Sequence, residues 1–297
     1  MRVARTDSIY DFVGHDQRSA DEHAVNDFYT ARPFPGYAAA DDGRTLLDRS
    51  HASPFLRALD QSVATDALVL DCGAGTGQLA AFLALAAPRR ELVAADVCRA
   101  SLDEAARFKR RACIDNLRLV RADLFLLPFP ERTFDVVISR GVVHHTPNPD
   151  GAIASVAGHV KEGGHLVLGF YESAARAVHR ARRGLSRVTR RPVHMLDPLL
   201  RRSDLDPGKK ENWIADQYHH PLERSLPFPH VLRRVEELGF EWVCTVPPSP
   251  GQRDLFSGTP RLSSLGVFAR RVGWCLAGFN DEDAGLIALV ARRHLRS

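Results

Sequence analysis

The sequence predicts an α/β fold built around a mainly parallel sheet, and three observations carry this prediction. Short, almost entirely apolar segments alternate with helical segments over residues 67–171. Strands of this kind are apolar throughout because helices cover both faces of a parallel sheet. A glycine-rich turn follows the first such segment, and an aspartate ends or follows each of the first three. At 297 residues and 44% hydrophobic composition the chain can form a substantial core, which excludes disordered, collagen-like and coiled-coil proteins.

The expected elements follow this alternation along the chain. Residues 1 to about 60 are expected to be irregular, with helical stretches over 21–29 and 46–59 and a break at Ser53-Pro54. The strand candidates are 67–70, 91–95, 117–120, 134–139, 165–170, 240–246 and 286–290. The helix candidates between them are 78–87, 99–112, 150–160 and 229–238, with Asp150 as an N-cap and Gly163-Gly164 as a stop. A loop rich in Pro, Gly and Ser is expected after residue 246.

The net charge of +4 is unevenly distributed. Residues 176–202 hold nine Arg and one acid, a local charge of +8, so the rest of the chain carries −4. The basic character therefore belongs to one segment and raises a local question about partners. Three hypotheses for this segment remain open: a solvated helix, a basic amphipathic helix on an anionic membrane surface, or a patch that binds the phosphates of RNA.

The chain shows no sign of secretion or of crossing a membrane. No apolar stretch approaches the roughly 18 residues of a membrane span, and segment 1–16 lacks the apolar region of a secretory signal. The five Cys are widely spaced without a CxxC pair, which favours reduced thiols over disulfides or zinc. We therefore expect a cytoplasmic protein, either free or peripheral to a membrane.

The glycine-rich turn is the first candidate binding site. Residues 71–77 (DCGAGTG) join a strand to a helix, so the backbone can approach a ligand and direct free N–H groups at it. The dinucleotide fingerprint GxGxxG requires a third glycine where this chain has Gln78. Asp71 would repel a pyrophosphate but suits a cationic ligand such as an amino group or a sulfonium.

Two further acids point to the same edge of the sheet. Asp96 ends the second strand 19 residues after Gly77, where an acid can accept both hydroxyls of a ribose. Asp123 follows the third strand, within reach of an adenine amino group. Packing does not require an acid after three successive strands, so the set indicates ligand binding rather than solvated loops.

These motifs resemble those of class I S-adenosylmethionine-dependent methyltransferases. VLDCGAGTG, VAADV, RADLFLLPF and FDVVISRGVVHHTPNP carry the likeness, which covers residues 67–171 well. It implies a Rossmann-like three-layer α/β/α sandwich, with a seven-stranded, mostly parallel sheet whose last strand is antiparallel. It also implies S-adenosylmethionine as the cofactor. The cofactor-binding residues expected from the acids and from this likeness are Asp71, Gly73, Ala74, Gly75, Gly77, Asp96, Asp123, Leu124 and Arg140.

The flanking segments are similar to a bacterial small-molecule methyltransferase-like group of unestablished substrate. The similarity lies in residues 26–29, 33–37, 213–221 and 273–275. The domain organisation expected is an N-terminal helical or irregular lid (1–60), a methyltransferase core (61–171 and 228–297) and an Arg-rich insertion (172–227).

The candidate catalytic residue is His145. Methyl transfer is an in-line displacement in a dry site, and a base is needed only where the nucleophile must lose a proton. The pair His144-His145 follows the fourth strand, and neutral imidazole can deprotonate a hydroxyl or an amine. The alternative is that one ring packs and the other hydrogen-bonds the loop backbone. No metal site is expected, since His219-His220 lacks supporting ligand spacing.

Several aromatic residues could line a substrate pocket or could instead anchor irregular segments to the core. They are Tyr29, Tyr37, Tyr171, Tyr218 and His220.

The expected function is transfer of a methyl group to a small-molecule or lipid-like acceptor. The alternatives are a tRNA or rRNA methyltransferase and a non-catalytic, S-adenosylmethionine-binding regulatory protein. The RNA alternative lacks an appended RNA-binding module and the Asn/Asp-Pro-Pro-aromatic signature of enzymes that methylate amino groups of nucleic acids. A nicotinamide oxidoreductase is disfavoured by Asp71 and Gln78.

Overall fold

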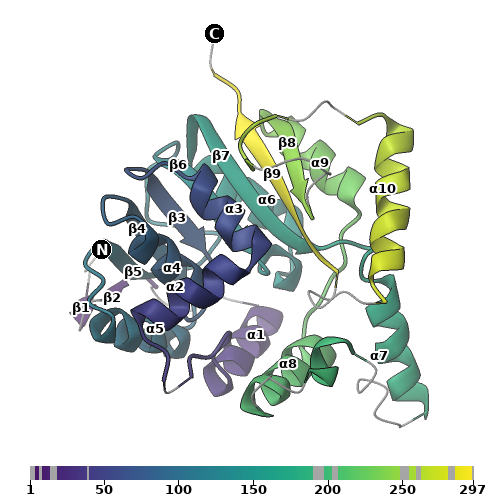
Figure 1. Ribbon diagram of the computed structural model, residues 1–297, viewed down its shortest axis with the longest axis horizontal. Coiled ribbons are helices and arrows are strands. Elements are labelled where there is room, and N and C mark those ends of the chain that lie inside the picture. The colour runs from purple at the N-terminus through teal and green to yellow at the C-terminus, as the bar shows by residue number, and fades with distance from the viewer. Residues whose placement is uncertain are drawn as a thin grey trace.

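One mixed sheet of nine strands runs through the molecule, with helices on both faces (Figure 1). The computed structural model describes residues 4–6, 9–13, 19–38, 40–189, 197–202, 207–247, 254–258, 262–279 and 285–295. The strand order is β1-β2-β5-β4-β3-β6-β7-β9-β8. The strands are β1 Ala4–Thr6, β2 Ile9–Asp11, β3 Leu68–Cys72, β4 Glu91–Asp96, β5 Leu117–Arg121, β6 Phe134–Arg140, β7 Val160–Tyr171, β8 Phe240–Val246 and β9 Leu286–Arg293.

The predicted fold class is confirmed by the pairing of seven neighbouring strands, which lie in the order β5-β4-β3-β6-β7-β9-β8. Strands β3 to β7 pair in parallel, and β9 runs antiparallel to both β7 and β8. The sheet is nevertheless wider than predicted. Strands β1 and β2 form an antiparallel pair, and β2 lies parallel beside β5. Strands of three residues are too short to show a period in the sequence, and only pairing with the sheet edge defines them.

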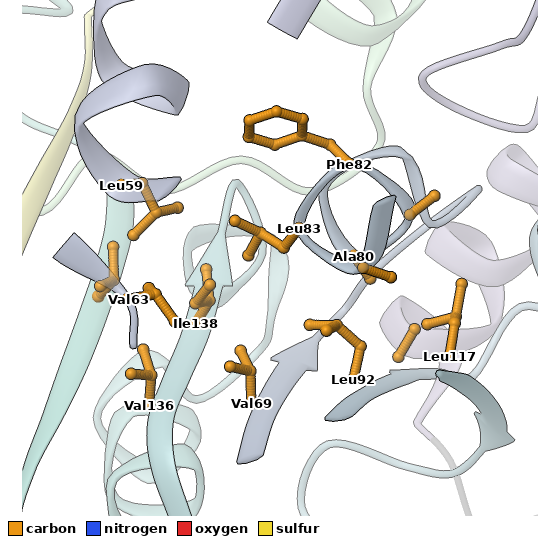
Figure 2. Packing of buried hydrophobic residues seen from close by; sticks show 14 of the residues in the cluster. Leu59, Val63, Val69, Ala80, Phe82, Leu83, Leu92, Leu117, Val136 and Ile138 are labelled. Atoms are coloured by element: carbon orange, nitrogen blue, oxygen red, sulfur yellow. The ribbon is translucent and has the colours of Figure 1, made fainter. Parts of the chain in front are cut away.

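The helices cover both faces of the sheet and the carboxyl ends of its parallel strands. They are α1 Ala20–Ala31, α2 Gly43–Ala52, α3 Pro54–Ser62, α4 Gln78–Ala86, α5 Arg99–Arg111, α6 Pro149–Gly158, α7 Ala177–Thr189, α8 Pro207–His219, α9 Phe228–Glu237 and α10 Ser264–Ala277, and a short 3₁₀ turn spans Val143–His145. Figure 2 shows the core on one face, where Leu59 of α3 and Leu83 of α4 pack over Val69 and Ile138 of the sheet. The other face is covered by α6 and α9 through residues such as Ile153.

Three local predictions needed correction. Strand β7 begins at Val160, so Gly163 and Gly164 lie within the strand and do not end the preceding helix. Glycine is needed at position 164 because an added Cβ would lie 2.7 Å from Asp135 O. Helix α6 is capped by Asn148, whose side chain accepts from Gly151 N at 3.0 Å. Helix α10 lies where a loop was expected, with Ser263 capping it and Trp274 buried against the core.

The elements from the N-terminal region and the Arg-rich insertion meet at the carboxyl ends of the parallel strands. Figure 1 shows α1 beside α8 there, and the hydroxyl of Tyr29 on α1 donates to Asp216 on α8 at 3.0 Å. Helices α7 and α10 follow one another along one side of the molecule (Figure 1). Arg182 of α7 donates to the carbonyl of Phe279, just after α10, at 3.0 Å. The insertion is thus tied to two other parts of the chain.

Candidate active site

A cavity of about 400 Å³ lies at the carboxyl ends of β3, β4, β5 and β6. One wall comes from the strand ends and their loops, and the other from α1, the 3₁₀ turn, the end of β7 and α8. The sequence-predicted residues that line it are Asp71, Gly73, Ala74, Gly75, Asp96, Asp123, Leu124, Arg140 and His145. Gly77 does not line it; this residue starts helix α4 with a φ of 74°. We call the first wall, which includes Asp71, Asp96, Asp123 and Arg140, the cofactor wall. We call the second wall, which includes Tyr29, His145, Tyr171 and Asp216, the acceptor wall.

The glycines of the turn are required by close contacts as well as by backbone conformation. Gly73 and Gly75 have φ of 72° and 55°, which side chains disfavour. A Cβ on Gly73 would lie 2.4 Å from the side chain of Val142, and one on Gly75 would lie 2.4 Å from the carbonyl oxygen of Phe34. The turn therefore presents bare backbone to the cavity while residues of the N-terminal region pack directly against it.

Gln78, the residue that breaks the dinucleotide fingerprint, holds this N-terminal segment in place. Its side-chain amide donates to the carbonyls of Pro35 and Gly36 at 3.1 and 3.0 Å. Tyr37 completes the clamp: its hydroxyl donates to Thr76 O at 3.1 Å, and its ring stacks on Phe108 with centroids 4.1 Å apart. Tyr37 is thus an anchor beneath the turn and does not line the cavity.

Two acids of the cofactor wall are held by backbone N–H groups. Asp96 accepts from Gly75 N at 2.7 Å with one carboxyl oxygen and from Cys98 N at 2.8 Å with the other. Burial raises the pKa of Asp96, while these N–H groups oppose the shift. Asp123 accepts from Phe125 N at 2.8 Å. Each carboxyl keeps lone pairs for a ligand, so the wall can accept hydrogen bonds from hydroxyl or amino groups.

Asp71 is the most strongly perturbed acid of this wall. Burial and the neighbouring charge of Asp96 raise its pKa to about 7, and Arg140 works in the opposite direction. A buried carboxyl of this kind is stabilised by a cation placed beside it. Arg140 is the one Lys or Arg side chain among the lining residues of the described chain. The cofactor wall therefore offers both signs of charge at one end.

On the acceptor wall, His145 is fixed by a backbone carbonyl. Its Nδ1 lies 2.7 Å from Leu222 O, so Nδ1 carries the hydrogen and Nε2 keeps a lone pair. Burial is the main cause that lowers the pKa of His145 to about 4, and the ring is neutral at pH 7. The predicted catalytic residue thus lies in the cavity in the form a base requires.

A chain of buried hydrogen bonds runs behind the acceptor wall, and sequence reasoning missed most of it. Arg176, fully buried, donates to Gln217 Oε1 at 2.6 Å and to Glu223 at 2.8 and 3.1 Å. The amide nitrogen of Gln217 donates to the hydroxyl of Tyr171 and to Asp216. Trp213, Asp216 and Gln217 all line the cavity. The only sequence signal was the likeness of segment 213–221 to a methyltransferase group.

The remaining aromatic candidates lie outside the cavity. The hydroxyl of Tyr218 donates to Asp197 at 3.0 Å. The ring of His220 packs on His145 with centroids 3.8 Å apart.

The ligand atoms available on His145, Asp216 and His220 lie within 4.8 Å of one another. However, His220 Nδ1 accepts from Leu222 N at 3.1 Å, so its Nε2 carries the hydrogen and faces the cluster as a donor. This Nε2–H has no hydrogen-bond partner among the described residues, and a protonated ring nitrogen does not fit a metal ion.

The Arg-rich segment is partly internal. Arg176 and Arg183 both pair with Glu223, at 2.8 and 3.0 Å. Arg180 is exposed and donates to Ser173 O, and Arg190 and Arg191 lie outside the described residues. A segment that carries +8 in the sequence thus uses several of its charges within the fold.

The strand-end acids and the bare glycine turn form a site that suits a cationic, ribose-containing ligand. Comparison with known proteins identifies the class of this domain: residues 70–168 match the family described as "Methyltransferase domain". This part of the chain is therefore a class I S-adenosylmethionine-dependent methyltransferase domain, and its cofactor is S-adenosylmethionine.

Two curated proteins are similar over the same part of the chain. The uncharacterized methyltransferase YcgJ of Bacillus subtilis is 31% identical over 100 residues, which are 34% of this chain and 39% of YcgJ. The ubiquinone/menaquinone biosynthesis C-methyltransferase UbiE of Pseudomonas putida is 36% identical over 102 residues, 34% of this chain and 40% of that protein. The chain thus spans about two-fifths of the length of these relatives.

A solved structure shares the fold over a longer stretch. PKMT2 of Rickettsia typhi, solved in complex with AdoHcy, superposes with a TM-score of 0.53 over 82% of this chain and 53% of its own, at 13% identity. At this identity the likeness concerns the fold alone.

Proposed function

We propose that this protein transfers the methyl group of S-adenosylmethionine to a small-molecule or lipid-like acceptor by in-line displacement. One observation carries the proposal: a single cavity joins the cofactor wall to an acceptor wall that holds a neutral histidine with a free lone pair. When bound, the cofactor supplies an electrophilic methyl group on a sulfonium. The residues of the chain hold it, exclude water and receive the proton of the acceptor.

The residues of the cofactor wall fit this cofactor. Asp71 suits the ammonium or sulfonium, and Arg140 suits the carboxylate of the methionine part. Asp96 keeps lone pairs for the ribose hydroxyls, and Asp123 with Leu124 suits the adenine. The bare turn at Gly73 and Gly75 leaves room for close approach, since an added Cβ at either glycine would collide with its neighbours.

The acceptor wall favours a small acceptor with an apolar body. Side chains such as Val25 of α1 and Trp213 of α8 line this side of the cavity, and its basic groups are few. The likeness to UbiE, a C-methyltransferase of ubiquinone and menaquinone biosynthesis, supports a lipid-like acceptor. The RNA alternative is less well supported, because Arg176 and Arg183 pair with Glu223 inside the protein.

Calorimetry with S-adenosylmethionine, S-adenosylhomocysteine and NAD tests the cofactor, and transfer of a labelled methyl group into a metabolite extract tests the reaction. We expect binding of the first two ligands, no binding of NAD, and a labelled small product. Binding without any transfer would favour the regulatory alternative, and binding of NAD alone would overturn the proposal.

Contact with an anionic membrane is supported by an exposed apolar face. On α7, on α10 and directly after α10, seven large apolar side chains are at least 42% exposed: Leu185, Val188, Leu265, Phe268, Val272, Leu276 and Phe279. The last five recur at spacings of three and four, one stripe of a helix, next to the Arg-rich α7. No described helix has the length and apolarity needed to cross a bilayer.

Co-sedimentation with vesicles tests this contact. We expect binding to vesicles of phosphatidylcholine and phosphatidylglycerol, weaker binding to phosphatidylcholine alone, and a loss in the double variant Phe268→Ser, Leu276→Ser. Equal sedimentation of variant and wild type, or self-association of the wild type without vesicles, would speak against a membrane partner.

A further inference from the structure

Arg176 determines the direction of the hydrogen bonds that Gln217 makes behind the acceptor wall. A guanidinium donates and never accepts, so the oxygen of the Gln217 amide must face Arg176, at 2.6 Å. The nitrogen of that amide then faces the other way. It donates to the hydroxyl oxygen of Tyr171 at 2.6 Å and to Asp216 Oδ2 at 2.7 Å. The orientation of Gln217 is therefore set by charge and leaves no second choice.

This direction determines what Tyr171 offers to the cavity. Because its oxygen already accepts from Gln217, its own hydrogen is left to donate. Burial raises the pKa of Tyr171, so the hydroxyl stays protonated. Tyr29 points its hydrogen at Asp216 Oδ1, 3.0 Å away, and does not compete for this role. Tyr171 is the hydroxyl of this wall that acts as a donor toward a ligand.

His145 offers the complementary group. Its Nδ1–H is bound to Leu222 O, and its Nε2 lone pair is left for the cavity that it lines. The rings of His145 and Tyr171 lie edge to face with centroids 5.8 Å apart. Beside the carboxyl of Asp216, whose oxygens accept from Tyr29 and Gln217, the acceptor wall thus presents one further acceptor and one donor close together.

We propose that the group methylated here is a hydroxyl, which donates its hydrogen to His145 Nε2 and accepts a hydrogen bond from the hydroxyl of Tyr171. The inference rests on the proposed methyl transfer. A hydroxyl oxygen has two lone pairs, so one can bind Tyr171 while the other attacks. A neutral amine has a single lone pair, which the attack uses, and an ammonium has none.

The step balances without any further reactant. The O–H bond of the acceptor breaks and its proton passes to His145 Nε2, while the oxygen forms a bond to the methyl carbon. The bond from that carbon to sulfur breaks, and its electron pair stays on sulfur. Tyr171 and His145 touch the reacting oxygen and are catalytic residues, whereas Arg176 and Gln217 are positioning residues.

The bond formed in the product tests the inference directly. The full chain is incubated with S-adenosylmethionine labelled with ¹³C in the methyl group and with a small-molecule extract of the source organism. The carbon shift of the new methyl signal then distinguishes its attachment. We expect a methoxy signal. An N-methyl or C-methyl product would overturn the inference and leave the proposed function intact, while cofactor binding without any labelled product would overturn both.

Two tyrosine variants provide the matched comparison. In Tyr171→Phe we expect the rate of transfer to fall about 100-fold, because the acceptor oxygen loses the hydrogen bond that orients its second lone pair toward the methyl group. Cofactor affinity, which also reports correct folding, should stay within twofold. Tyr218→Phe removes a hydroxyl that bonds Asp197 away from the cavity and should leave the rate unchanged. A Tyr171→Phe variant with normal cofactor binding and normal rate would refute the role of this hydroxyl.

Discussion

The cofactor wall and the acceptor wall of the same cavity are assembled in different ways. The predicted residues of the cofactor wall fall between Asp71 and Arg140, each at or just after the end of a parallel strand. The acceptor wall joins α1, the 3₁₀ turn, β7 and α8. The bond from Tyr29 to Asp216 in this wall spans 187 positions of sequence. One wall follows from local sequence, and the other exists only once distant segments meet.

The two walls also differ in how they use charge. The cofactor wall gathers acids whose pKa values burial raises, which suits a cationic ligand. The acceptor wall presents one acid, Asp216, among neutral groups, and its charged pair of Arg176 and Glu223 stands behind them. This pair directs hydrogen bonds rather than binding the ligand. We therefore expect the affinity for the cofactor and the orientation of the acceptor to depend on different residues of this cavity.

Removal of Arg176 should show the difference between the two walls most clearly, because it affects methyl transfer and leaves cofactor binding nearly unchanged. In Arg176→Met the carboxyl of Glu223 loses its closest partner in a buried site, and Arg183 is the one basic side chain of the described residues that still pairs with it. We expect the free energy of unfolding to fall by about 3 kcal/mol and methyl transfer to be lost, while cofactor affinity stays near normal. Urea denaturation and calorimetry measure these quantities. The exposed Arg180→Gln should change stability by less than about 0.5 kcal/mol.

Substitution of Asp96 should produce the opposite pattern. In Asp96→Ala the hydrogen bonds from Gly75 N and Cys98 N and those to the ribose are lost. We expect affinity for S-adenosylhomocysteine to fall about 100-fold, since each charged hydrogen bond contributes about 1.5–3 kcal/mol. The chain from Arg176 to Tyr29 should remain intact. Unchanged affinity in calorimetry would show that the acids of the cofactor wall do not hold the ligand.

The smallest expected effect is the pH dependence of cofactor binding. The pKa of Asp71 is raised to about 7 in the free protein, so below pH 7 the carboxyl must lose a proton before it can stabilise a cation. Affinity should therefore be nearly constant above about pH 8 and fall toward tenfold per pH unit below 7. Calorimetry across this range measures the slope. Asp71→Asn should bind more weakly and flatten it; a slope that persists in this variant would assign the titration to another group.

The residues of the cofactor wall could be predicted from the sequence more completely than those of the acceptor wall, for a physical reason. Every acid expected at the cofactor wall lines the cavity, because the carboxyl ends of adjacent parallel strands must share one edge of the sheet. His145 was found by the same rule. Asp216 and Gln217 were not found, since nothing local to helix α8 shows that Arg176 will orient them. The short strands β1 and β2 were missed similarly, because pairing with β5 defines them.

The parallel sheet, the glycine turn and the acids at the strand ends could be predicted from the sequence, since each depends on residues close together in the chain. The sequence also located the basic segment. The folded structure is needed to see that Arg176 is buried, that Gln78 clamps the N-terminal segment and that His145 keeps a lone pair. These facts depend on contacts between residues far apart in sequence, and the hydrogen-bonding direction of each group is set by the partner that folding brings to it.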